Sequence, residues 1–234
     1  MTVKRYRRRG AKRLMRWMLS ALVLLTPSLV RAQARGLTTA DLPPQLAQAT
    51  RQAIERLADS VRAARLPSDP IYAKAAEGVL KGAEDARILA AVHRLARALG
   101  DARRALGDDA DEAELVAGAS ALQSGVPAAM LRRLREAQRP SPRGSLATPL
   151  IVLADLVTRR VPPGVAAAAI DSLVARSAPS EDFATLRAAV ERDIGAGRAP
   201  DAATLLRTRS LLEALNASEH GTNRRVPRGG PAPD

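Results

Sequence analysis

Apolar residues recur at helical spacing across almost the whole of residues 41–216. Residues 84–106 show this most clearly, with apolar positions that alternate by steps of four and three: Ile88, Val92, Leu95, Leu99, Ala102 and Leu106. Such steps place the apolar side chains on one face of a helix, where they can pack against a core. No run of alternating β-branched residues competes with this pattern. The sequence therefore predicts an all-α protein.

Prolines divide this helical region into short units. Each of Pro127, Pro162, Pro179 and Pro200 follows an apolar residue and opens a predicted helix, where the missing N–H and the fixed φ of proline cost nothing. Residues 139–145 are rich in Pro, Ser and Arg and form a possible sub-boundary. We predict one domain of about eight short helices, either an irregular bundle or a helical-hairpin array. The uneven proline spacing leaves open whether the helices form a solenoid or a closed bundle.

The first 34 residues have the three parts of a secretory signal peptide. Basic residues up to Arg16 precede the 14 uncharged residues 17–30, and Ala32 and Ala34 occupy the two positions that a signal peptidase reads. As a helix, this uncharged segment is about 21 Å long, short of the roughly 30 Å hydrocarbon core of a bilayer. We therefore predict cleavage after Ala34 and a periplasmic or secreted domain over residues 35–216. The chain is then expected to contact the membrane only during export, through the signal segment.

The positive charge of the chain is concentrated in this segment. Residues 1–34 carry nine of the 13 net positive charges and no acidic residue, so the remainder is nearly neutral. A nearly neutral body lacks the basic surface that nucleic-acid binding needs, so we expect no nucleic-acid partner. Residues 217–234 have little apolar content, and we predict a disordered C-terminal tail there.

Residues suited to catalysis are scarce. The chain has no cysteine and two histidines, of which His93 is expected at the margin of a buried helix face as a partly buried structural residue. It also lacks a G-x-S-x-G, an H-E-x-x-H and a glycine-rich phosphate loop. The acidic residues 108–114 do not follow the calcium-loop pattern, and we interpret them as helix-capping groups. We predict no cofactor and no metal site.

One set of candidate binding residues lies on the predicted helix 71–81. Lys74 and Lys81 are the only lysines after residue 34, and Glu77 lies between them at spacings of three and four, beside Tyr72. These residues could form a patch for an acidic ligand. Because charges at this spacing usually form ion pairs on a solvated face, we prefer that interpretation.

Asp155 is a further candidate because it interrupts the otherwise apolar residues 150–157. We expect a buried carboxylate that pairs with Arg159, one helical turn later. If Asp155 and Asp171 instead converge in a cleft, the two carboxylates could support a hydrolase that uses carboxylates alone.

The scarcity of catalytic side chains favours a non-enzymatic function. We predict an exported helical interaction or scaffold protein of the cell envelope, with an unidentified protein partner. The first alternative is the carboxylate-dependent hydrolase built on Asp155 and Asp171. The second alternative is a membrane-tethered accessory protein that keeps its N-terminal segment uncleaved.

Overall fold

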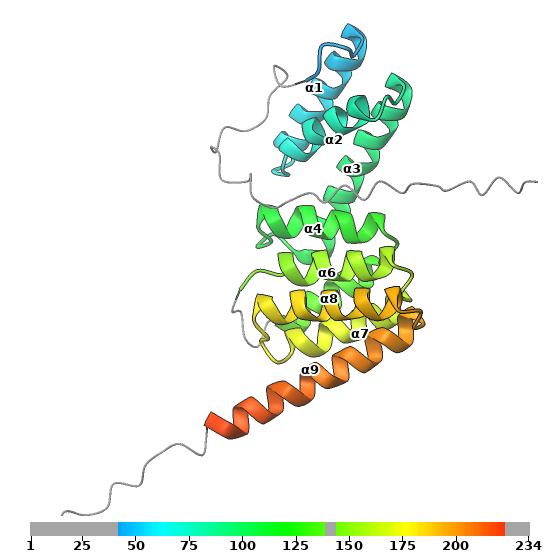
Figure 1. Cartoon of the computed structure of the whole chain (residues 1–234). Helices are drawn as coiled ribbons and strands as arrows, with labels where there is room; N and C mark the ends of the chain where they lie inside the picture. The colour runs from blue at the N-terminus through cyan, green and yellow to red at the C-terminus, as the bar shows by residue number, and fades with distance from the viewer. Residues whose placement is uncertain (1–41, 139–143, 223–234) are drawn as a thin grey trace, which may run out of the picture. The chain divides into compact units, whose positions relative to one another are not determined.

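The computed structural model of the chain describes residues 42–138 and 144–222. These residues form nine helices and no strand: α1 (Gln48–Ala63), α2 (Asp69–Leu80), α3 (Asp85–Leu106), α4 (Glu112–Gln123), α5 (Ala128–Gln138), α6 (Ala147–Thr158), α7 (Pro163–Val174), α8 (Ser180–Gly195) and α9 (Pro200–Thr222) (Figure 1). The all-α prediction is confirmed, with nine helices where about eight were expected. The predicted signal peptide, with Ala32 and Ala34, lies outside the described residues.

The helices pack mainly against their neighbours in chain order. The helices α1, α2 and α3 pack on one another, and α3 also packs against α4 and α5. Two rows follow: α4, α6 and α8 pack in succession (Figure 1), and so do α5, α7 and α9. The main contacts thus join helices that are at most two positions apart in the chain. Such packing is typical of a helical-hairpin array, in which each unit contacts the units next to it.

Local helix ends explain the short turns of this array. Gly125 and Arg160 follow α4 and α6 with positive φ values of 101° and 68°. The next residues, Val126 and Val161, each donate an N–H to the carbonyl five residues earlier, at 3.0 Å in both turns. This arrangement is the Schellman motif, in which an apolar residue after the left-handed residue packs back on the helix. Both valines are buried. In these two turns, the apolar residue before the helix-opening proline is therefore part of the motif that ends the preceding helix.

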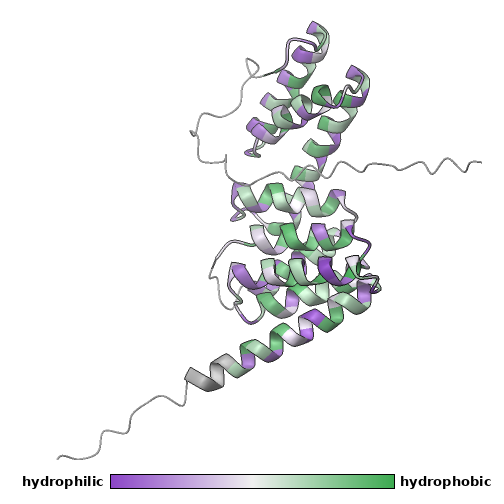
Figure 2. Ribbon diagram, in the orientation of Figure 1, coloured by the Kyte–Doolittle hydropathy of each residue, from purple (hydrophilic) through white to green (hydrophobic). Residues whose placement is uncertain are grey.

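The core is a single cluster of apolar residues to which all nine helices contribute. Figure 2 shows hydrophobic residues spread along all of the helices rather than gathered in a few. Small residues let the helices approach closely. At Gly118 of α4, an added Cβ would lie 2.9 Å from Leu106 Cδ1 and 3.2 Å from Ala102 Cβ on α3. Because real Cβ contacts are rarely so short, glycine is needed for this packing.

Two features of the organisation concern the predicted tail and the possible sub-boundary. First, α9 continues to Thr222, so residues 217–222 of the expected tail are helical, because proline and glycine are missing from the sequence between Pro200 and Gly221. Second, α4 packs on α6 and α5 packs on α7 across residues 139–145. All described residues belong to one compact unit, so that segment connects parts of one domain.

Across residues 42–138 and 144–222, every helix is too short or too polar to cross a bilayer. The uncharged residues 17–30, on which the signal-peptide prediction depends, are not among them. The export prediction therefore stays a prediction from the sequence.

Candidate functional site

Asp155 does not pair with Arg159, so that prediction was wrong. Asp155 Oδ2 accepts a hydrogen bond from Arg187 Nη1 of α8 at 3.0 Å. Arg159 Nη2 lies 2.9 Å from Glu191 Oε1, also on α8. The Asp155 side chain is 38% exposed rather than buried. Because α8 packs directly on α6, it offers Arg187 to Asp155 and Glu191 to Arg159. These pairs between helices replace the expected pair between Asp155 and the residue one turn later.

Asp171 of α7 has a separate partner. Its Oδ2 lies 3.0 Å from Arg133 Nε of α5, and its side chain is 15% exposed. Its Oδ1 is buried without a hydrogen-bond partner among the described residues. Burial raises the pKa of Asp171, and the positive charge of Arg133 partly offsets this effect. Asp155 and Asp171 thus pair with arginines on different helices, an arrangement that does not favour a shared two-carboxylate centre.

The lysine face of α2 is a set of ion pairs. Glu77 accepts hydrogen bonds from Lys74 Nζ, at 2.8 Å, and from Lys81 Nζ. These two ammonium groups, Lys74 first, hold the pKa of Glu77 below its usual value. Tyr72 does not belong to this face, contrary to expectation, because it is buried in the core. Residues two apart on a helix do not share a face, which explains why Tyr72 points away from Lys74.

Glu114 is a buried carboxylate whose burial and tertiary partners are not visible in the sequence. As predicted for residues 108–114, it takes part in helix capping: the Glu114 N–H donates to Asp111 Oδ1 at 2.8 Å, and the Asp111 N–H donates to Glu114 Oε2 at 3.2 Å. The same side chain also accepts hydrogen bonds from the Arg135 guanidinium of α5 and from the Leu146 N–H, at 2.7 Å.

Arg135 extends this network to a fourth helix. Its Nε donates to the Leu106 carbonyl at the end of α3, at 3.1 Å, and its Nη1 donates to Gln138 Oε1 at 2.8 Å. Glu114 and Arg135 therefore join α3, α4, α5 and the start of α6. The capping-box spacing is visible in the sequence, but burial of the glutamate is a product of tertiary packing.

A second charged group joins α8 to α9. Arg207 donates to both oxygens of Asp193, from Nη2 at 2.7 Å and from Nε at 2.8 Å. Arg198 Nε lies 3.5 Å from Asp193 Oδ2. These hydrogen bonds, with the arginine charges, hold the pKa of Asp193 below its usual value. With its carboxylate fully engaged by arginines, Asp193 has a structural role.

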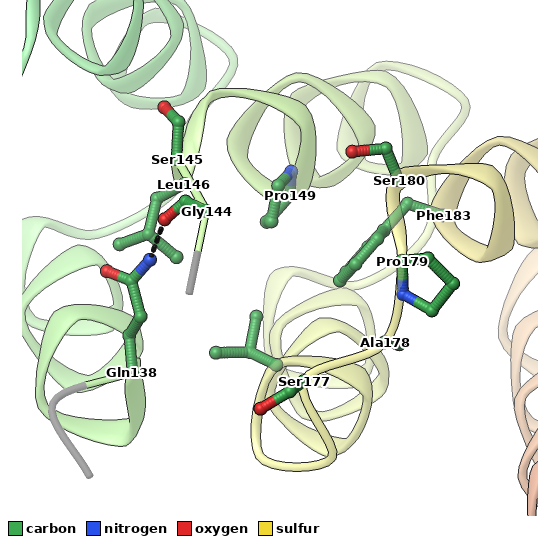
Figure 3. A pocket seen from close by; sticks show the side chains of 11 residues that line it. Gln138, Gly144, Ser145, Leu146, Pro149, Ser177, Ala178, Pro179, Ser180 and Phe183 are labelled. Atoms are coloured by element: carbon green, nitrogen blue, oxygen red, sulfur yellow. Dashed lines mark hydrogen bonds between the residues drawn. The ribbon is translucent and has the colours of Figure 1, made fainter. Parts of the chain in front are cut away.

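One hollow of about 200 Å³ lies where the ends of α5 and α7 meet the starts of α6 and α8 (Figure 3). Its side chains are polar or apolar but not charged: Gln138, Ser145, Leu146, Pro149, Val174, Ser177, Ala178, Pro179, Ser180 and Phe183, with Gly144. Gln138 Nε2 donates to the Gly144 carbonyl at 2.6 Å (Figure 3). Because no acid, base or thiol among the described residues lines the hollow, its hydroxyl groups have no partner that would activate them.

A wider groove lies between the exposed sides of α4 and α6, and we call it the α4–α6 groove. It has a volume of about 660 Å³ and is lined mostly by small and apolar residues: Glu112, Ala113, Val116, Ala117, Ser120, Ala147 and Ile151. Val116 and Ile151 are 36% and 48% exposed. The alanines that line the groove, Ala113 and Ala117 of α4 and Ala147 of α6, have small side chains, so they leave space between these two larger side chains. The groove can thus bury apolar groups of a partner.

Comparisons of the chain with protein-family models, with curated proteins and with solved structures find no match. Function is therefore inferred from the residues and the geometry of this chain alone.

Proposed function

We propose that this protein is an exported, non-enzymatic interaction protein of the cell envelope that binds a helical segment of a partner protein in the α4–α6 groove. The observation that supports this proposal is the pair Val116 and Ile151, two large apolar side chains exposed next to each other on adjacent helices. Contiguous exposed apolar surface on a folded protein is typical of an interaction site. The separate arginine partners of Asp155 and Asp171 support a function without catalysis.

The charge at one end of the groove specifies the partner. Glu112 lines the groove at the start of α4 and is exposed. Its carboxylate forms no ion pair within residues 42–138 and 144–222. A complementary partner is an amphipathic helix that places apolar residues between Val116 and Ile151 and a basic residue beside Glu112.

Defined peptides test this proposal. A fluorescent helical peptide with an apolar stripe and flanking lysines is titrated with the protein, and a second peptide carries the same stripe with glutamate in place of lysine. We expect the basic peptide to bind more tightly, as measured by fluorescence anisotropy. Ile151→Ser should weaken this binding about three- to tenfold, because the peptide would bury the remaining half of the Ile151 side chain.

Leu205→Ser is the matched control for Ile151→Ser. Leu205 is 59% exposed on α9 and does not line the groove, so its substitution should leave the affinity for the basic peptide unchanged. Equal binding of the basic and acidic peptides would contradict the proposed role of Glu112. Equal effects of Leu205→Ser and Ile151→Ser would contradict the groove itself.

A further inference from the structure

A second groove, of about 370 Å³, lies between α1 and α3, and we call it the α1–α3 groove. Its apolar residues come from both helices and from the turn after α1: Leu57, Val61, Ala64, Leu66 and Ala96. Ser60 of α1 and the polar side chains of α3 complete the lining: His93, Arg97, Asp101 and Arg104. The groove shares no residue with the α4–α6 groove.

The α3 side of this groove carries a stripe of three basic residues, beside Asp101. His93, Arg97 and Arg104 follow one another at spacings of four and seven, which places them along one side of the helix. His93 is exposed, whereas the sequence analysis expected it to be partly buried. Arg104 forms an ion pair with Asp101. Arg97 forms no ion pair with any other residue that the structure describes, so its guanidinium is open to an external anion.

Gly100 lines the same groove, between Arg97 and Arg104. Glycine inside a helix lowers its stability relative to alanine. At Gly118 that cost has a packing reason, because an added Cβ would lie 2.9 Å from Leu106 Cδ1. At Gly100 an added Cβ would meet only Arg104 Nη1, at an ordinary 3.7 Å. Packing within the described part of the protein therefore does not require glycine here, and its missing side chain deepens the groove.

We infer that the α1–α3 groove binds a small anionic amphiphile, with an apolar chain on the floor and a carboxylate among His93, Arg97 and Arg104. The charged head would form charge-assisted hydrogen bonds with the guanidinium groups. The chain would cover apolar surface that is otherwise in contact with water. The volume lies within the range of about 300–1,000 Å³ that is typical of small-molecule sites. This site is separate from the proposed protein-binding groove and does not depend on it.

Octanoate is a suitable probe because 1-octanol and acetate provide its chain and its charge separately. Protein recovered from the producing cell is titrated with each compound, and binding is followed through backbone amide chemical shifts. We expect octanoate to bind at least about tenfold more tightly than either 1-octanol or acetate, since only octanoate uses both the floor and the stripe. The shifted amides should lie within residues 57–66 and 93–104.

Two leucine variants locate the site. Gly100→Leu should fill the groove and reduce octanoate affinity at least about tenfold, while the melting temperature stays the same or rises because leucine is the better helix former. Gly195→Leu is the control, because an added Cβ at Gly195 of α8 meets nothing within 4 Å and Gly195 does not line the α1–α3 groove; this variant should bind octanoate like the parent protein.

A charge variant completes the test. Arg97→Gln should weaken octanoate binding and leave 1-octanol binding unchanged. Any of three results would overturn the inference: octanoate does not bind at millimolar concentration, 1-octanol binds as tightly as octanoate, or Gly100→Leu retains the parent's octanoate affinity.

Discussion

Replacing Glu114 by alanine should destabilise the protein by about 3–5 kcal/mol, the usual cost of removing one partner of a buried ion pair. The Glu114 side chain is 4% exposed, and its oxygens accept hydrogen bonds from Arg135, from the Leu146 N–H and from the Asp111 N–H. Glu114→Ala would leave the Arg135 guanidinium, on a side chain that is only 19% exposed, without its carboxylate. It would also leave the Leu146 N–H, a buried donor, without an acceptor.

Two further variants separate the contributions of charge and hydrogen bonding. Glu114→Gln keeps an acceptor for the Leu146 N–H but loses the negative charge, so it should cost less than Glu114→Ala, roughly 1–3 kcal/mol. Glu114→Leu combined with Arg135→Met should be more stable than Glu114→Leu alone, because no unpaired guanidinium is left in the interior. Recovery should be partial, since the Leu146 N–H still lacks its acceptor.

Urea unfolding and thermal melts followed by circular dichroism measure these differences. For a domain of this size, 3–5 kcal/mol corresponds to a fall of roughly 6–20 °C in melting temperature. Glu77→Ala is the control: its side chain is 41% exposed, so the loss of its two lysine pairs should cost less than about 1 kcal/mol. If Glu114→Ala and Glu77→Ala unfold at the same urea concentration, the buried network does not stabilise the fold as argued.

Four other substitutions have defined outcomes. Asp155→Asn should cost less than about 1 kcal/mol in urea unfolding, because Asp155 and its partner Arg187 are both more than one third exposed; a loss several times larger would show a buried pair. Asp171→Asn should raise the melting temperature near pH 7 but not near pH 3: burial raises the pKa of Asp171, so its contribution to stability is full below the unfolded pKa of about 3.9 and is lost as the pH rises through the folded pKa. Arg160→Gly should stabilise the protein by about 1 kcal/mol and Gly125→Ala should destabilise it similarly, because both positions have positive φ; thermal melts that move in the opposite directions would contradict this reasoning.

The features that could be predicted from the sequence act within one or two helical turns. Apolar periodicity located the helix expected at residues 84–106, which the structure places at Asp85–Leu106. Prolines located helix starts because their effect depends on the local backbone. The capping role of Asp111 follows from a short polar side chain placed three residues before a glutamate.

Features that depend on which helices meet could not be predicted. Asp155 has Arg159 one turn away, yet it pairs with Arg187, 32 residues along the chain. Glu114 resembles any other first-turn acid in the sequence, and only the packing of α3, α5 and α6 around it produces a buried network. In both cases the register between neighbouring helices decides which side chains meet. The spacing of residues within one helix carries no information on that register.

The register between stacked helices is regular, although the spacing of the helix-opening prolines in the sequence is uneven. Asp155 pairs with Arg187 and Arg159 pairs with Glu191, so α6 and α8 run parallel, and both pairs span 32 residues. The hydrogen bond from the Leu146 N–H to Glu114 also spans 32 residues, between α4 and the start of α6.

The two junctions of this row nevertheless expose different chemistry. Two ion pairs lie on the exposed side of the α6–α8 junction. At the α4–α6 junction the exposed side chains of Val116 and Ile151 are apolar. Apolar groups that bind at the α6–α8 junction would have to displace two ion pairs, while at the α4–α6 junction they would cover surface that has no partner among the described residues. This difference in surface chemistry is the reason we propose the α4–α6 groove, rather than the α6–α8 junction, as the site for a helical partner.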